Sequence, residues 1–365
     1  MPWTVDEIES EWLAGERLQF PPEDVVRAFA VAEQIRGREW VLSTTNIQGG
    51  GRQWGFAPFL RVYAFGKRIQ TVAGTPGADG LLGRLSQDDP AAESELTAMH
   101  LLRSRCPESE IEIEPEVIVG GRYRRPDFRI RHRTANWTYV EVRQLNPSMA
   151  SERTQEVLSG IARQVSSILQ PFVLEIVLWR GPTEGEEEEL IRQAREACHA
   201  IGGDRRDIGD LASIVVKSGD PTVVTPSILP EDDGTRMSLA QSIVGPGQPN
   251  RQIVVRAPFA DQRAEDILTE KAKQLPKDES GLVMVDVARQ PTAFQSWAEL
   301  MPRRFTAVQH TRVAGVVLFM TATTITEQGL AWRPYLKLIS NPHASIPLAA
   351  WITSAVEEIR AEGRR

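Results

Sequence analysis

The chain has 365 residues, of which 41% are apolar and 25% are charged, a composition typical of a globular protein and one that excludes wholesale disorder. Its net charge of −7 argues against a uniformly basic nucleic-acid-binding surface, but not against a local basic groove. The two cysteines, Cys106 and Cys198, form no CxxC pair, so neither a disulfide framework nor a Cys-rich zinc site is expected. The start of the chain lacks the pattern of a signal peptide, and no apolar run could span a membrane. We therefore expect a soluble cytoplasmic protein that does not contact membranes.

Residues 1–85 predict an N-terminal α+β region. Two helical patterns come first, at Val5–Leu18 and Glu23–Ile35. Strand-like segments follow at Trp40–Thr44, Phe59–Phe65 and Lys67–Val72. The glycine-rich segment Asn46–Phe56 has no GK[ST] and precedes a predicted strand, which favours a mobile hairpin loop over a phosphate-binding loop. The Gly- and Pro-containing segment Thr75–Gly83 is interpreted as a domain boundary.

Residues 86–180 predict a mixed α/β core with the element order α-β-β-β-α-β. Asp88-Asp89-Pro90 is a helix-start signal, and this helix is expected to run to about Arg105. The remaining elements are strands at Ile111–Val119 (interrupted or bent at Pro115), Asp127–His132 and Trp137–Leu145, a helix at Ser151–Leu169, and a strand at Phe172–Trp179. The last strand is apolar throughout, as in a parallel sheet buried on both faces.

Residues 181–365 predict a C-terminal α/β extension, which could continue the core sheet. An acidic run opens a helix at Glu184, and Pro221–Asn250 is expected to contain a long loop. The other predicted helices are Arg263–Leu275 and Leu348–Glu362, and the predicted strands are Ile214–Lys217, Thr222–Val224, Gln252–Arg256, Leu282–Val287, Val313–Met320 and Tyr335–Ile339.

Two neighbouring strands carry the chemically informative residues. Pro126-Asp127 opens one strand, and Glu141-Val142-Arg143 lies in the next. Because side chains alternate along a strand, Glu141 and Arg143 share one face, while Val142 points to the other. Two carboxylates that converge in this way suit Mg²⁺, which needs few protein ligands. The pattern therefore predicts a metal site with an adjacent cation.

These residues resemble the PD-(D/E)xK nuclease superfamily, in which Pro-Asp and Glu-x-Lys occupy successive strands. The resemblance covers about residues 90–180 and implies a restriction-endonuclease-like core that cleaves DNA with Mg²⁺ or Mn²⁺. It implies that Asp127 and Glu141 are catalytic metal ligands, assisted by Glu95 on the preceding helix, with Glu93 as an alternative to Glu95. Segments near the C-terminus, including Asn341-Pro-His-Ala, resemble those that accompany this core in some bacterial proteins.

Arg143 stands where the superfamily has its lysine. Arginine can stabilise transition-state charge by contact with phosphate, but it cannot act as a general base. Lys271, Lys273 and Lys217 are other lysines that could reach the site. The sequence pattern itself predicts that Lys271 and Lys273 are exposed helix charges.

Arginines cluster around Asp127, which suggests nucleic-acid contacts. The predicted phosphate-binding set is Arg122, Arg124, Arg125, Arg129 and Arg131, with Arg133 on the same expected face as Arg129 and Arg131. The alternative is that they pair with Glu112, Glu114 and Glu116. Tyr123, Trp137 and Tyr139 could stack on bases or could pack within the sheet.

Three functional hypotheses remain open from the sequence. The first is a metal-dependent DNA nuclease, which could work as a homodimer because two strands need two sites. The second is a catalytically degenerate core that binds nucleic acid or a protein partner without cutting, and it is motivated by Arg143. The third is a structural protein in which the acids only pair with arginines.

Overall fold

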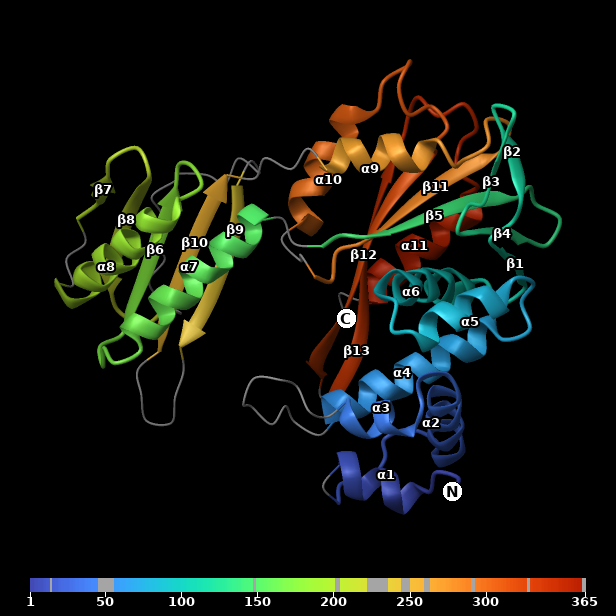
Figure 1. Ribbon diagram of the computed structural model, residues 1–365, viewed down its shortest axis with the longest axis horizontal. Coiled ribbons are helices and arrows are strands. Elements are labelled where there is room, and N and C mark those ends of the chain that lie inside the picture. The colour runs from blue at the N-terminus through green and yellow to red at the C-terminus, as the bar shows by residue number, and fades with distance from the viewer. Residues whose placement is uncertain are drawn as a thin grey trace. The chain divides into compact units, whose positions relative to one another are not determined.

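The computed structural model divides the chain into two compact units (Figure 1). Unit 1 comprises residues 1–145, 263–288 and 301–365, and unit 2 comprises residues 146–262 and 289–300. The residues described are 1–13, 15–44, 56–146, 149–200, 204–221, 236–243, 250–258, 263–289, 293–326 and 329–362. No helix in these ranges is long and apolar enough to cross a membrane.

Unit 1 is built on a mixed sheet that has six strands within the described residues. Their spatial order is β1-β4-β5-β11-β12-β13. The bounds are β1 Ser109–Ile113, β4 Phe128–His132, β5 Thr138–Gln144, β11 Ser280–Asp286, β12 Gly315–Thr326 and β13 Gly329–Ser340. β1, β4 and β5 form an antiparallel meander, β11 and β12 run parallel to β5, and β13 returns antiparallel to β12. The expectation of a mixed α/β sheet is confirmed.

The predicted order α-β-β-β-α-β occurs in this sheet, but its last two elements are not the predicted ones. After β5 the sheet continues with helix α9 (Arg263–Ala272) and β11. The strand predicted to complete the core, β6 (Phe172–Leu178), pairs instead with strands of unit 2. An apolar sequence predicts a strand that is buried in a sheet, but it does not predict which strands lie beside it. The chain therefore leaves the core after β5 and returns at α9, rather than ending the core near residue 180.

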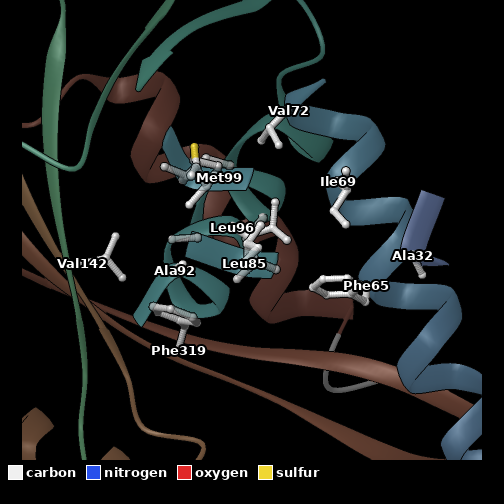
Figure 2. Close-up of a cluster of buried hydrophobic side chains, with 14 of the residues drawn as sticks. Ala32, Phe65, Ile69, Val72, Leu85, Ala92, Leu96, Met99, Val142 and Phe319 are labelled. Atoms are coloured by element: carbon white, nitrogen blue, oxygen red, sulfur yellow. The ribbon is translucent and has the colours of Figure 1, made fainter. Parts of the chain in front are cut away.

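Helices cover both faces of the unit 1 sheet (Figure 1). Helix α9 lies on one face, and α6 (Pro90–Arg105) and α11 (Ala350–Glu362) lie on the other. Asp89 caps α6 as predicted, accepting a hydrogen bond from the Ala91 backbone N–H at 2.9 Å. In Figure 2, Leu96 and Met99 of α6 lie between Val142 of β5 on one side and Phe65 and Ile69 of the helical N-terminal region on the other.

The N-terminal region is helical where it is described, so the prediction of strands there is wrong. Its helices are α1 Val5–Trp12, α2 Pro22–Arg36, α3 Arg38–Ser43, α4 Phe56–Val72 and α5 Ala78–Ser86. Helix α3 covers most of the segment predicted as a strand at 40–44, and α4 covers those predicted at 59–65 and 67–72. The buried residues of α4 recur every three or four residues, at Phe59, Val62, Phe65, Ile69 and Val72, of which Figure 2 labels the last three. Gly66 is a contact point between helices rather than a break, because a Cβ there would lie 2.0 Å from Ala28 O of α2. The glycine-rich segment 45–55 lies outside the described residues, and the expected boundary at 75–83 is occupied by α5.

A β-hairpin leaves the sheet between β1 and β4. It consists of β2 (Val117–Val119) and β3 (Arg122–Arg124), and Gly120 and Gly121 at its tip both have positive φ. The interruption predicted at Pro115 is confirmed, since β1 ends at Ile113 and Glu114, with a φ of 50°, makes the bend before Pro115. The hairpin leads through Pro126 directly to Asp127.

Unit 2 has its own sheet and core. As far as the chain is described, its strand order is β7-β8-β6-β10-β9. The bounds are α7 Met149–Val165, α8 Glu184–Ala200, β7 Arg206–Ile208, β8 Ala212–Ser218, β9 Arg236–Ile243 and β10 Arg251–Pro258. Strand β9 falls within the predicted long loop, and the strand predicted at Thr222–Val224 lies outside the described residues. Helix α10 (Ala293–Arg304), which was not predicted, spans a point where the chain passes between the units.

Candidate active site

Asp127 and Glu141 come together because β4 and β5 are adjacent antiparallel strands. Phe128 pairs with Val140, so Asp127, one residue before the strand, lies level with Glu141. The Val142 backbone N–H donates to Asp127 Oδ2 at 2.6 Å, which fixes the aspartate against the edge of β5. Val140 and Val142 are buried in the core beneath α6, as expected, so Glu141 points to the α9 face.

Lys271 of α9 supplies the cation at these two carboxylates. Its Nζ lies 2.6 Å from Glu141 Oε2 and 3.5 Å from Asp127 Oδ2. The Lys271 side chain is only 13% exposed, so the prediction of an exposed helix charge is wrong for this residue. On α9 it continues the buried stripe of Ala264, Ile267 and Leu268 at helical spacing.

Arg143, two residues beyond Glu141, has an exposed side chain. Strand alternation places it on the same face as Glu141, but in the described part of the chain it forms no ion pair with Asp127 or Glu141. Lys273 is exposed as predicted, and Lys217 is an exposed residue of β8 in unit 2. Of the cations considered from the sequence, Lys271 is therefore the one that contacts both acids.

Glu95 lies on the buried side of α6 and is held by an arginine. Arg84 of α5 donates to both Glu95 oxygens, at 2.8 and 2.6 Å, and to Glu114 Oε1 at 3.0 Å. The alternative residue, Glu93, lies 3.7 Å from Arg36. No group of three Asp, Glu, His or Cys side chains placed to share a metal ion occurs within the described residues. The structure therefore brings Asp127 and Glu141 together, while Glu95 is engaged by Arg84.

The pKa values of the buried carboxyl groups are raised above their ordinary values. Burial, with the neighbouring Asp127, raises the pKa of Glu141 to about 8 even though Lys271 opposes the shift. Burial also raises the pKa of Glu95 to about 7, against the opposing effect of Arg84. The pKa of Lys271 is raised despite its burial, because Asp127 and Glu141 favour its charged form. One ammonium does not balance two carboxylates, so the group has an affinity for a proton or for a further cation.

One oxygen of Glu141 is left without a partner by the surrounding side chains that the structure describes. Glu141 Oε1 is buried and has no hydrogen-bond partner among the described residues, and the Glu141 side chain is 2% exposed. An unsatisfied carboxylate oxygen in such a position is costly. The Asp127 side chain is 20% exposed, so the group is open to solvent on that side. Oxygen donors of this kind, supplemented by water, fit Mg²⁺ or Mn²⁺.

Most of the arginines around the site are paired with glutamates. In the β1–β4 register, Arg129 faces Glu112 and Arg131 faces Glu110. Their ion pairs measure 2.5 and 2.6 Å, Arg133 pairs with Glu108 at 2.5 Å, and Arg125 pairs with Glu116. Arg122 and Arg124 of the hairpin form no ion pair with a described carboxylate, and Arg124 Nε is buried without a partner. The alternative in which arginines pair with glutamates therefore holds for Arg129 and Arg131 of β4. Among the described residues, the guanidinium groups of Arg122 and Arg124 in the hairpin form no such ion pair.

The aromatic residues near the site divide into two kinds. Tyr139 is 5% exposed, and its hydroxyl accepts a hydrogen bond from Arg129 at 3.0 Å. Arg129 and Arg131 both lie over the Trp137 ring, each 4.4 Å from its centroid. Tyr123 of the hairpin is 77% exposed. Tyr139 and Trp137 therefore serve packing, and Tyr123 is the aromatic ring that is open to a ligand.

Comparison with known proteins adds no assignment. A scan against protein-family models gives no match, and a search of curated proteins finds no similar chain.

Two site residues were not assigned from the sequence, Lys271 and Arg84. Lys271 carried a detectable signal, since it is a lysine within the apolar stripe of α9. Arg84 carried none, because its helix was interpreted as a boundary.

Proposed function

We propose that the protein is a metal-dependent phosphodiesterase that cleaves nucleic acid, with DNA as the substrate to test first. The observation that carries the proposal is the group formed by Asp127, Glu141 and Lys271, in which a buried oxygen of Glu141 has no partner in the described part of the chain. Two carboxylates and a lysine that meet on adjacent strands are the residue types that phosphoryl transfer with Mg²⁺ requires.

The arrangement of elements supports a restriction-endonuclease-like core. The order α6-β1-β4-β5-α9-β11, with an antiparallel meander and β11 parallel to β5, follows the α-β-β-β-α-β pattern of that core. In this interpretation residues 146–262 of unit 2 are an insertion between β5 and α9. The lysine of the superfamily motif is then replaced in space by Lys271, which comes from a helix instead of from the position of Arg143.

Each site residue has a role that follows from its contacts. Asp127 and Glu141 would hold Mg²⁺ or Mn²⁺, which would polarise the phosphoryl oxygen and lower the pKa of an attacking water. Lys271, kept charged by the two carboxylates, would stabilise negative charge developing at the phosphate. Arg84 would hold Glu95 beside them. We assign backbone contacts to Arg122, since the arginines of β4 are paired.

The proposal is tested by incubating single-stranded and duplex DNA and RNA with the purified protein and Mg²⁺ or Mn²⁺. We expect cleavage by the wild type, loss of cleavage with EDTA, and loss with Asp127→Asn, which keeps the shape of the side chain. Lys217→Met, on an exposed strand position of unit 2, is the control. Identical behaviour of wild type and Asp127→Asn on every substrate would refute the proposal.

A degenerate core that binds nucleic acid without cutting is the second candidate. It is favoured by the ion pairing of the acids, because Lys271 and Arg84 already contact Glu141 and Glu95. This function predicts salt-sensitive DNA binding without product in either metal. It also predicts that Asp127→Asn leaves the affinity for DNA unchanged.

A further inference from the structure

A second concave site lies beside the C-terminal end of α9, in unit 1. The cavity has a volume of about 480 Å³ and is formed by α9, the segment that follows it and the loop before β12. Lys273, Lys277 and Arg312 line it, together with the polar residues Thr311 and Gln309. None of its described lining residues is acidic. The chain has a net charge of −7, so the positive charge of this pocket is opposite in sign to that of the chain as a whole.

The cations of this pocket differ from the arginines of β4. Lys273 and Lys277 are exposed and form no ion pair with a carboxylate in the part of the chain that the structure describes. Arg312 is half-buried, and its Nη1 donates to Leu275 O at 3.4 Å, which ties the guanidinium to the end of the helix segment. Ammonium groups without carboxylate partners keep their full attraction for an external anion.

The loop that forms one wall is held in a fixed, strained conformation. His310 has a φ of 59°, in the left-handed region that residues other than glycine seldom adopt. Asn341 Nδ2 donates to His310 O at 3.1 Å and to Val313 O at 2.7 Å, and Asn341 is buried. The Ser345 backbone N–H donates to Thr311 O at 2.7 Å. Strain that is held in place by a buried side chain is typical of a binding loop, and here it preforms the pocket.

We propose that this pocket binds the phosphate group of a nucleotide. Lys273, Lys277 and Arg312 supply charge, and Arg312 can present a planar donor pair to phosphate. Val308, which is 88% exposed and lines the same pocket, offers an apolar surface to the sugar or base. The phosphate can belong to a nucleic-acid strand or to a free nucleotide. This site goes beyond the proposed nuclease function and does not depend on it.

The test compares wild type, Lys273→Ala/Lys277→Ala and the control Lys217→Ala, all in EDTA so that no cleavage takes place. Binding of a short fluorescein-labelled single-stranded oligonucleotide is followed by anisotropy, and binding of AMP by calorimetry. For a strand phosphate, the double variant binds the oligonucleotide at least about tenfold more weakly, and its salt slope is shallower by about 1.4. For a free nucleotide, AMP binds to wild type, competes with the oligonucleotide, and is lost in the double variant.

The proposal is overturned if the double variant binds both probes as tightly as wild type, or if Lys217→Ala weakens binding equally. Circular dichroism melting of all three proteins checks that the exposed substitutions leave the fold unchanged. Because the measurement uses no metal, a protein without nuclease activity would still give a decisive result for this pocket.

Discussion

Replacing Lys271 by methionine removes the ammonium and keeps most of the length and apolar surface of the side chain. In the wild type, Nζ lies 2.6 Å from Glu141 Oε2 and 3.5 Å from Asp127 Oδ2. The ammonium therefore repels any divalent cation that these carboxylates hold. We expect Lys271→Met to bind Mn²⁺ more tightly than the wild type while cleaving more slowly, because in the proposed reaction the charge that weakens metal binding would also stabilise the transition state.

The size of the effect follows from Coulomb's law. At a separation of roughly 4 Å, a unit charge and a divalent cation repel by about 2 kcal/mol even with the screening of bulk water. Removing this repulsion corresponds to about thirtyfold tighter binding. The same substitution removes the effect by which Lys271 lowers the pKa of Glu141, so protons compete more strongly with the metal and offset part of this gain. The net expectation near pH 7 is a lower dissociation constant for Mn²⁺ than in the wild type, with about thirtyfold as the upper bound.

Isothermal titration calorimetry with Mn²⁺ measures this directly. Wild type, Lys271→Met and the control Lys217→Met are compared at pH 7, with Asp127→Asn to show that the heat comes from this site. An unchanged or weaker affinity in Lys271→Met would refute the reasoning, because the ammonium would then not face the bound cation.

Three further predictions concern stability. The folded-state pKa of Glu141, about 8, lies above its ordinary value, so the metal-free protein should lose thermal stability as pH rises from about 5 to about 9, and Glu141→Gln should flatten that curve. Arg84→Met leaves Glu95 without its two hydrogen bonds, and urea unfolding should show a loss of about 2 kcal/mol at pH 8 and less at pH 5, where the carboxyl takes up a proton; equal losses would contradict this. Gly66→Ala places a Cβ 2.0 Å from a backbone oxygen of α2 and should cost at least about 2 kcal/mol, whereas Gly83→Ala meets open space in α5 and should gain up to about 1 kcal/mol. A Gly66→Ala protein as stable as wild type in urea would show that α2 and α4 can separate.

The sequence predicted β4, which follows Asp127, and β5, which carries Glu141, because both strands are short and are bounded by turn residues. The Asp89-Pro90 start of α6 is a local hydrogen-bonding signal, so it was also predictable. Helix α4 was mistaken for two strands because aromatic and β-branched residues raise strand propensity, and because Gly66 resembled a break. Its role is a close contact with α2, which only the packed structure reveals.

The completion of the site could not be predicted in the same way. Lys271 is separated from Glu141 by more than a hundred residues of chain. The helix and the strand that follow Glu141 along the chain, α7 and β6, lie in unit 2, where β6 pairs with β10. Element order alone therefore assigned the wrong helix to the core. The buried stripe of α9 contained the evidence, since a lysine among Ala264, Ile267 and Leu268 needs a partner inside the protein.

We propose that Lys271, and not Arg143, is the cation of this site. The most direct test is the single-turnover rate of DNA cleavage at saturating Mn²⁺. Saturation removes the change in metal affinity, so the rate reports charge stabilisation alone. We predict that Lys271→Met slows cleavage by on the order of a hundredfold and that Arg143→Gln slows it far less. A rate that falls with Arg143→Gln and stays at the wild-type value with Lys271→Met would contradict the assignment.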